Sequence, residues 1–127
     1  MILLDTCAFV WMSLNQPKLT KRALGMIESN RLSISSMTFM EVGYLIKKGR
    51  ISIPCGLNDF LSLAVDVHEL EVHQITPEIS EIAMNFDESV NGDPADRIIS
   101  ATAICNNLKL ITSDKNLRKS KSVPTVW

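Results

Sequence analysis

The chain has 127 residues, of which 46% are hydrophobic and 21% charged, and its formal net charge is −1. This length and composition predict one globular domain spanning residues 1–127 and exclude a chain that is mainly disordered. The longest apolar run, residues 7–12, is far shorter than the about 20 residues that span a bilayer, and no basic, apolar leader opens the sequence. We therefore expect no membrane association and no secretory signal.

The first half of the chain alternates short apolar runs with longer helical patterns. Residues 1–4 are continuously apolar, as in a strand buried on both faces, and residues 32–35 form a second short strand. Apolar residues recur at helical spacing over 17–30, 38–48 and 57–67. This alternation indicates strands connected by helices.

The second half continues the alternation. Residues 71–75 and 108–112 are expected strands, and residues 123–126 form a short edge strand. Thr76 and Asp93 are each followed by proline, a pair of residues that is typical of a helix start. The pattern predicts an α/β fold with a parallel sheet covered on both faces, in which ligands bind beyond the carboxyl ends of the strands.

Three cysteines, Cys7, Cys55 and Cys105, lie far apart in the sequence. An odd and scattered set argues against a disulfide framework and against a zinc site built on close cysteine pairs. We therefore expect a reducing, cytoplasmic setting.

Charge is distributed unevenly along the chain. Residues 1–50 and 97–127 are rich in lysine and arginine, whereas residues 51–96 contain acidic residues and neither of the two cations. The middle segment is either a solvated acidic face, or it separates two basic flanks that meet in space and attract a polyanion.

Four acidic residues are expected at the carboxyl edge of the sheet. Asp5 ends the first strand, and Asp114 follows the strand at 108–112. Glu41 and Asp96 are placed in the first turns of two helices beside these strands. The predicted topology therefore directs all four side chains toward one crevice.

Three of these acids also have a purely structural explanation. Thr38 and Glu41 match a capping box, Asp96 is favoured by a helix dipole, and Asp114 can cap a short helix over residues 115–119. Asp5 has a weaker explanation of this kind, as the cap of a helix that starts at the next residue.

The convergence of the four acids favours a metal site. Two carboxylates about 4 Å apart repel by roughly 4 kcal/mol at an effective dielectric constant near 20, so the group needs a cation. Mg²⁺ and Mn²⁺ prefer oxygen ligands, and such an ion can activate water and neutralise charge on a phosphodiester. Thr112 and Ser113 precede Asp114 and are placed to orient a carboxylate or a water molecule.

Four motifs occur in order along the chain: LLDT at 3–6, TFME at 38–41, DPADR at 93–97 and ITSD at 111–114. Together they resemble the PIN-domain ribonucleases and, within these, the VapC-type toxins of bacterial type II toxin–antitoxin pairs. The segments ITPEIS at 75–80 and VPTVW at the end of the sequence, with Trp11, extend the resemblance over essentially the whole chain.

The resemblance implies a three-layer α/β/α sandwich, a homodimer, an antitoxin partner and an endoribonuclease that depends on Mg²⁺ or Mn²⁺. A metal-activated water would cleave RNA and leave a 5′-phosphate and a 3′-hydroxyl. Asp5, Glu41, Asp96 and Asp114 would be the catalytic acids, with Asp5, Asp96 and Asp114 as metal ligands. Asp93 would have a supporting role.

Cys7 departs from the residue that many relatives carry after the LLDT motif. We expect it to be a small buried residue whose pKa is raised by the neighbouring acids, and therefore no nucleophile. Phe9 and Trp11 can stack on bases, although packing at the sheet edge or at a dimer interface is more common for such residues.

Several cations have both a functional and a structural interpretation. Arg97 either holds an acid in place or contacts phosphate, and Lys115, Arg118 and Lys119 form either an RNA-binding rim or a solvated helix. Lys47, Lys48 and Arg50 end a helix, and stabilisation by the helix dipole is the favoured explanation there.

Two other functional classes remain open. A phosphotransfer domain of the receiver or phosphatase type fits the length and the alternation, but the expected strand at 71–75 ends without an aspartate. A non-catalytic PIN module that only binds an antitoxin is the other alternative, and binding of Mn²⁺ would argue against it.

Overall fold

The strands of the computed structural model, which describes residues 1–87, 90 and 92–127, form one five-stranded sheet. Its order is β3-β2-β1-β4-β5, and every neighbouring pair is parallel. The strands are β1 (Ile2–Leu4), β2 (Leu32–Ser35), β3 (Glu71–His73), β4 (Lys109–Ile111) and β5 (Thr125–Val126). The predicted parallel sheet is therefore confirmed.

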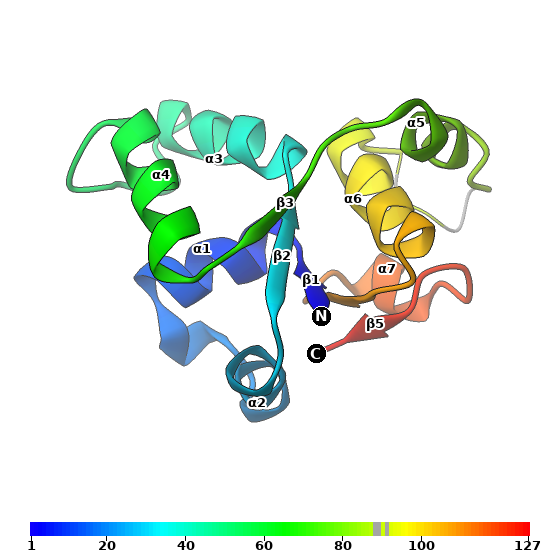
Figure 1. Ribbon diagram of the computed structural model, residues 1–127, viewed down its shortest axis with the longest axis horizontal. Coiled ribbons are helices and arrows are strands. Elements are labelled where there is room, and N and C mark those ends of the chain that lie inside the picture. The colour runs from blue at the N-terminus through cyan, green and yellow to red at the C-terminus, as the bar shows by residue number, and fades with distance from the viewer. Residues whose placement is uncertain (88–89, 91) are drawn as a thin grey trace.

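Helices cover both faces of the sheet, as the α/β/α expectation requires. Figure 1 shows α1, α3 and α4 on one side and α5, α6 and α7 on the other. The helices are α1 (Thr6–Leu14), the 3₁₀ turn η1 (Gln16–Lys18), α2 (Lys21–Ser29), α3 (Met37–Lys47), α4 (Leu57–Val67), α5 (Pro77–Met84), α6 (Pro94–Cys105) and α7 (Lys115–Lys119). None of the described helices is long and apolar enough to cross a membrane.

Each face of the sheet has its own core, because successive strand residues point to opposite faces. Ile2 and Leu4 pack in the cluster beneath α1, whereas Leu3 packs with Leu110 and Ile99 on the α6 side. All five side chains are at most 2% exposed. Burial on both faces explains why the central strands are continuous aliphatic runs.

The aromatic residues after β1 serve packing. Phe9 is fully buried and meets Phe60 edge-on, with ring centroids 6.4 Å apart. The Trp11 ring lies 5.6 Å from the ring of Trp127, and the Lys18 ammonium lies over Trp11 at 5.8 Å. These contacts confirm the packing interpretation of Phe9 and Trp11.

Two details of the expected helices are wrong. The helix predicted over 17–30 is divided into η1 and α2, because the Thr20 side chain caps α2 by accepting the amide of Ala23 at 3.0 Å. The capping box is also wrong, since α3 begins one residue before Thr38, and Glu41 accepts a hydrogen bond from the Thr6 side chain.

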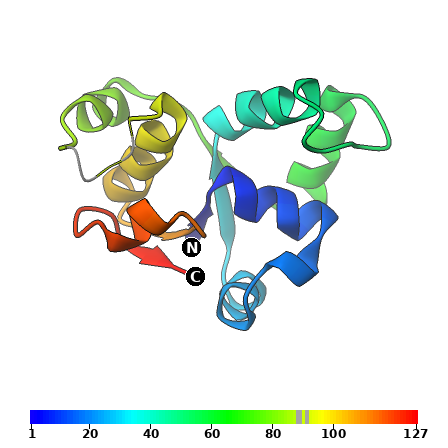
Figure 2. The ribbon, with the colours of Figure 1, turned by 180° about the vertical axis from the view of Figure 1, so that it is seen from behind.

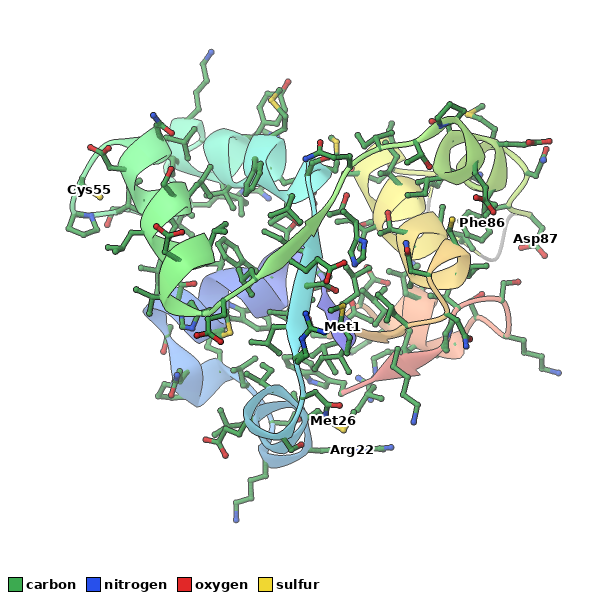
Figure 3. The ribbon with its side chains drawn as sticks, viewed as in Figure 1. Met1, Arg22, Met26, Cys55, Phe86 and Asp87 are labelled. Carbon is green, nitrogen blue, oxygen red and sulfur yellow. The ribbon has the colours of Figure 1, made fainter. Side chains whose placement is uncertain are left out.

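All three cysteines are free thiols, as the absence of a disulfide framework requires. Cys55 lies in the connection between α3 and α4, at the outer edge of the molecule in Figure 3. Cys7 is exposed, so the expectation that it is buried is wrong.

Candidate metal centre

The candidate site lies where the two central strands end and the next helices begin. β1 and β4 pair in parallel, so Asp5 and Asp114 follow neighbouring strands at the same edge of the sheet. α3 and α6, which carry Glu41 and Asp96, contact each other at this edge. Figure 2 shows α1 and α3 on one side of the sheet and α6 and α7 on the other, with their first turns toward the middle.

Three carboxylates come together here: Glu41, Asp93 and Asp96, which we call the acidic cluster. One oxygen from each lies within 4.8 Å of the others. Glu41 and Asp96 are half-buried, whereas Asp93 is exposed. The cluster therefore includes Asp93, to which the resemblance assigns only a supporting role.

Asp5 lies next to this cluster and also caps a helix. Its side chain caps α1 by accepting the amide hydrogen of Ala8 at 2.7 Å. The pKa of Asp5 is raised from 3.8 to about 6: burial is the main cause, hydrogen bonds from Thr112 and Ala8 oppose the shift, and the charges of Asp96 and Glu41 add to it. A nearby cation would therefore lower the pKa of Asp5 and stabilise its charged form.

Thr112 connects two of the predicted site residues. Its hydroxyl accepts the amide hydrogen of Asp114 at 3.1 Å and makes the hydrogen bond that lowers the pKa of Asp5. Thr112 is fully buried, while Ser113, the next residue, is half-buried. A buried hydroxyl in this position holds the Asp5 carboxylate and the backbone of Asp114 relative to the sheet.

Glu41 is held by a residue that the sequence analysis did not single out. The Thr6 hydroxyl donates to a Glu41 oxygen and lies 3.3 Å from the Thr38 hydroxyl. Burial raises the pKa of Glu41, Asp96 and Asp93 raise it further, and the Thr6 hydrogen bond lowers it. The signal in the sequence was the position of Thr6 directly after Asp5.

Asp93 and Asp114 also cap helices. Asp93 accepts the amide hydrogens of Ala95 at 2.8 Å and Asp96 at 3.2 Å, at the start of α6. Asp114 accepts the amide hydrogen of Leu117 at 2.9 Å, at the start of α7. A carboxylate that caps with one oxygen has further lone pairs for another ligand, so capping and metal binding are compatible.

The negative charges of the site affect the pKa of the Cys7 thiol. Its pKa is raised to about 11, chiefly because the sulfur is partly desolvated, and the charges of Asp5, Glu41, Asp96 and Asp114 contribute to this shift. All four acids therefore lie within electrostatic range of one atom. At neutral pH the group is a thiol, which agrees with the expectation that it is no nucleophile.

The expected cations lie around the site rather than within the acidic cluster. The Arg97 guanidinium donates to the carbonyl oxygens of Ala83 at 3.1 Å and Phe86 at 3.3 Å, and so ties α6 to the end of α5. The three exposed cations of α7 follow Asp114, and two of them lie in the last turn; they are Lys115, Arg118 and Lys119.

The donor set suits a hard divalent cation. Carboxylate oxygens are the ligands that Mg²⁺ and Mn²⁺ prefer, and the raised pKa values of Asp5 and Glu41 show that their charges lack full compensation. The surrounding hydroxyls orient the carboxylates, as partners of metal ligands commonly do.

Comparison with known proteins agrees with this geometry. Residues 2–122 match the family described as PIN domain, and the chain belongs to this family. Ribonuclease VapC22 of Mycobacterium tuberculosis is 30% identical over 129 residues, which cover 99% of this chain and 98% of the relative. The resemblance to VapC-type PIN proteins drawn from the ordered motifs is therefore confirmed.

Solved structures share the fold over the full length. A structure of VapBC2 from Rickettsia felis bound to a promoter DNA fragment has a TM-score of 0.71 at 19% identity, covering 100% of this chain and 99% of that chain. A toxin-antitoxin complex from Klebsiella pneumoniae has a TM-score of 0.69 at 22% identity, covering 100% and 97%.

Proposed function

We propose that this protein is an endoribonuclease dependent on Mg²⁺ or Mn²⁺, and that it acts as the toxin of a toxin–antitoxin pair. The observation that carries the proposal is the convergence of Glu41, Asp93 and Asp96 within 4.8 Å beside Asp5, at the carboxyl edge of the sheet. The relative named a ribonuclease, at 30% identity over the full length, supports the reaction class.

The acids have two roles in this proposal. Asp5, Asp96 and Asp114 would hold the cation, and Glu41 and Asp93 would complete its surroundings from α3 and α6. When bound, a divalent cation supplies an acidified water and offsets the charge that develops on the phosphodiester.

Hydroxyl groups of the site orient two of these acids, Glu41 and Asp5. The Thr6 hydroxyl fixes one oxygen of Glu41, and Thr112 joins Asp5 to the backbone of Asp114. Such preorganisation lowers the cost of assembling like charges before the substrate arrives. The thiol of Cys7 adds no negative charge to the site.

The partners are proposed on the same basis. The similar structures from Klebsiella pneumoniae and Rickettsia felis are described as a toxin-antitoxin complex and as VapBC2, so we infer that a cognate antitoxin binds this chain. RNA is the proposed substrate, the cytoplasm the proposed compartment and a homodimer the proposed assembly.

Cleavage of total bacterial RNA tests the function. The protein, freed of antitoxin, is incubated with the RNA and Mn²⁺ or Mg²⁺, beside an EDTA control and an Asp96→Asn variant. We expect discrete fragments only with the wild-type protein and metal, with 5′-phosphate ends at the cuts. Cleavage that persists in EDTA would contradict the metal mechanism.

The same preparation separates the two alternatives. Intact RNA together with no heat of Mn²⁺ binding would support a non-catalytic module that binds only an antitoxin. Stable labelling of the protein by a phosphodonor would support a phosphotransfer domain.

A further inference from the structure

A cavity of about 360 Å³ extends from the acidic cluster along α3. Glu41 and Asp93 line one part of it, and Lys48 and Arg50 line another. Tyr44 also lines the cavity and is 52% exposed. The cavity therefore combines the acids of the proposed site with two cations and an exposed aromatic ring.

Helical spacing explains this arrangement. Glu41, Tyr44 and Lys48 follow each other at steps of three and four residues, so they share one face of α3. At 1.5 Å per residue, Glu41 and Lys48 are separated by about 10 Å along the helix axis. The face thus changes from negative to aromatic to positive with distance from the acidic cluster.

Arg50 joins this face because the chain reverses at the end of α3. Gly49 has a φ angle of +71°, a conformation that glycine adopts at low cost. The amide of Arg50 then donates to the carbonyl oxygen of Leu45 at 2.9 Å, and that of Gly49 donates to Ile46 at 3.0 Å. These bonds fix the backbone of Arg50 beside the last turn of the helix.

We propose that this cavity binds the single-stranded RNA segment that flanks the cleaved bond, with one base stacked on Tyr44 and a phosphate beside Lys48 and Arg50. The inference rests on the proposed nuclease function and names where its substrate lies. An exposed ring stacks on any unpaired base, and cations in the same groove neutralise the backbone.

The helix dipole alone does not explain these residues. Stabilisation of a helix end by cations applies to Lys47 as much as to Lys48, since both end α3. Lys47 is exposed but does not line the cavity. It is therefore a matched control with the same charge at the same helix end.

Fluorescence anisotropy with a short, labelled single-stranded RNA of mixed sequence tests the subsite. Binding is measured in Ca²⁺, with the intact length of the RNA checked on a gel. Tyr44→Ala should weaken binding about tenfold, because one stacked base is lost, and Tyr44→Phe should bind like the wild-type protein. Lys48→Gln combined with Arg50→Gln should reduce the magnitude of the slope of log affinity against log salt by about 0.7, the value for one phosphate of a single strand, and Lys47→Gln should leave it unchanged.

The outcomes separate this proposal from the proposed function. Affinity and salt slope that are the same in the wild-type and cavity variants would overturn the subsite, as would a wild-type protein that does not bind the RNA. Weaker binding by the cavity variants supports the subsite, even if no RNA is cleaved with Mn²⁺, a result that would overturn only the nuclease. Thermal unfolding of each variant shows that the effect does not come from loss of the fold.

Discussion

The two ends of the sheet differ in whether an acidic residue lies beside a cation or beside other acids. At the amino end, Glu71 of β3 lies 3.7 Å from Arg31, which directly precedes β2, and both side chains are well exposed. At the carboxyl end, Glu41, Asp93 and Asp96 gather beside Asp5, whose pKa is raised to about 6. The first arrangement is a solvated ion pair, whereas the second concentrates negative charge.

This difference shows which end is organised for a ligand. An exposed ion pair contributes little to stability, and its two opposite charges compensate each other without a further ligand. A group of acids with raised pKa values opposes folding in the absence of a cation, and proteins tolerate such a cost at functional sites.

The largest effect is expected on RNA cleavage. Asp96→Asn should lower the rate about a hundredfold or more, because one charged oxygen donor leaves the acidic cluster. Asp59→Asn is the matched control, since Asp59 is also the third residue of a helix, α4, but lies outside the site. Equal rates for the two variants, measured with Mn²⁺ on the same RNA, would contradict the account.

The next effect concerns the hydroxyl that organises the carboxyl end. Thr112→Val should lower the free energy of unfolding by about 1–3 kcal/mol, because the half-buried amide of Asp114 loses its partner and Asp5 loses a donor. Thr112→Ser should restore most of the loss. Urea unfolding measures both, with Thr125→Val in β5 as the control. A Val variant as stable as wild type would show that this hydroxyl does not organise the site.

How far the sequence predicts these features depends on the range of the interactions involved. The alternation of apolar runs predicts the strands and most helices, since burial on both faces demands it, but the cap at Thr20 divides a helix that periodicity alone joins. The connection rule for parallel strands places Asp5 and Asp114 at one edge. The proximity of Asp93 to Glu41, and the Thr6 hydrogen bond, depend on how α6 packs against α3, which no local pattern contains.

The pH dependence of stability follows from Asp5. Its pKa in the folded chain lies near 6, above the value of 3.8 for a free side chain, so the folded state holds the proton more tightly than the unfolded state. In EDTA, the free energy of unfolding should therefore fall as pH rises from about 4 to above 6. Thermal melts of wild-type protein and Asp5→Asn test this, since the variant should lack that component. Parallel pH profiles would show that Asp5 is not perturbed.

The smallest effect compares single acids at the two ends. In EDTA, Glu41→Gln should raise the free energy of unfolding slightly, because repulsion within the cluster decreases while the amide oxygen still accepts from Thr6. Glu71→Gln should lower it slightly, by less than about 1 kcal/mol, because an exposed ion pair is lost. Urea unfolding at neutral pH measures both, and shifts of the same sign would remove the contrast between the ends.

Calorimetric titration of Mn²⁺ tests the central claim most directly, namely that the carboxyl end of the sheet holds a divalent cation. The wild-type protein and Asp59→Asn should bind Mn²⁺ with similar affinity, and Asp96→Asn should bind it at least about tenfold more weakly. Binding should also strengthen as pH rises through about 6, where Asp5 loses its proton. No heat of binding to the wild-type protein, or equal affinity in Asp96→Asn, would contradict the claim.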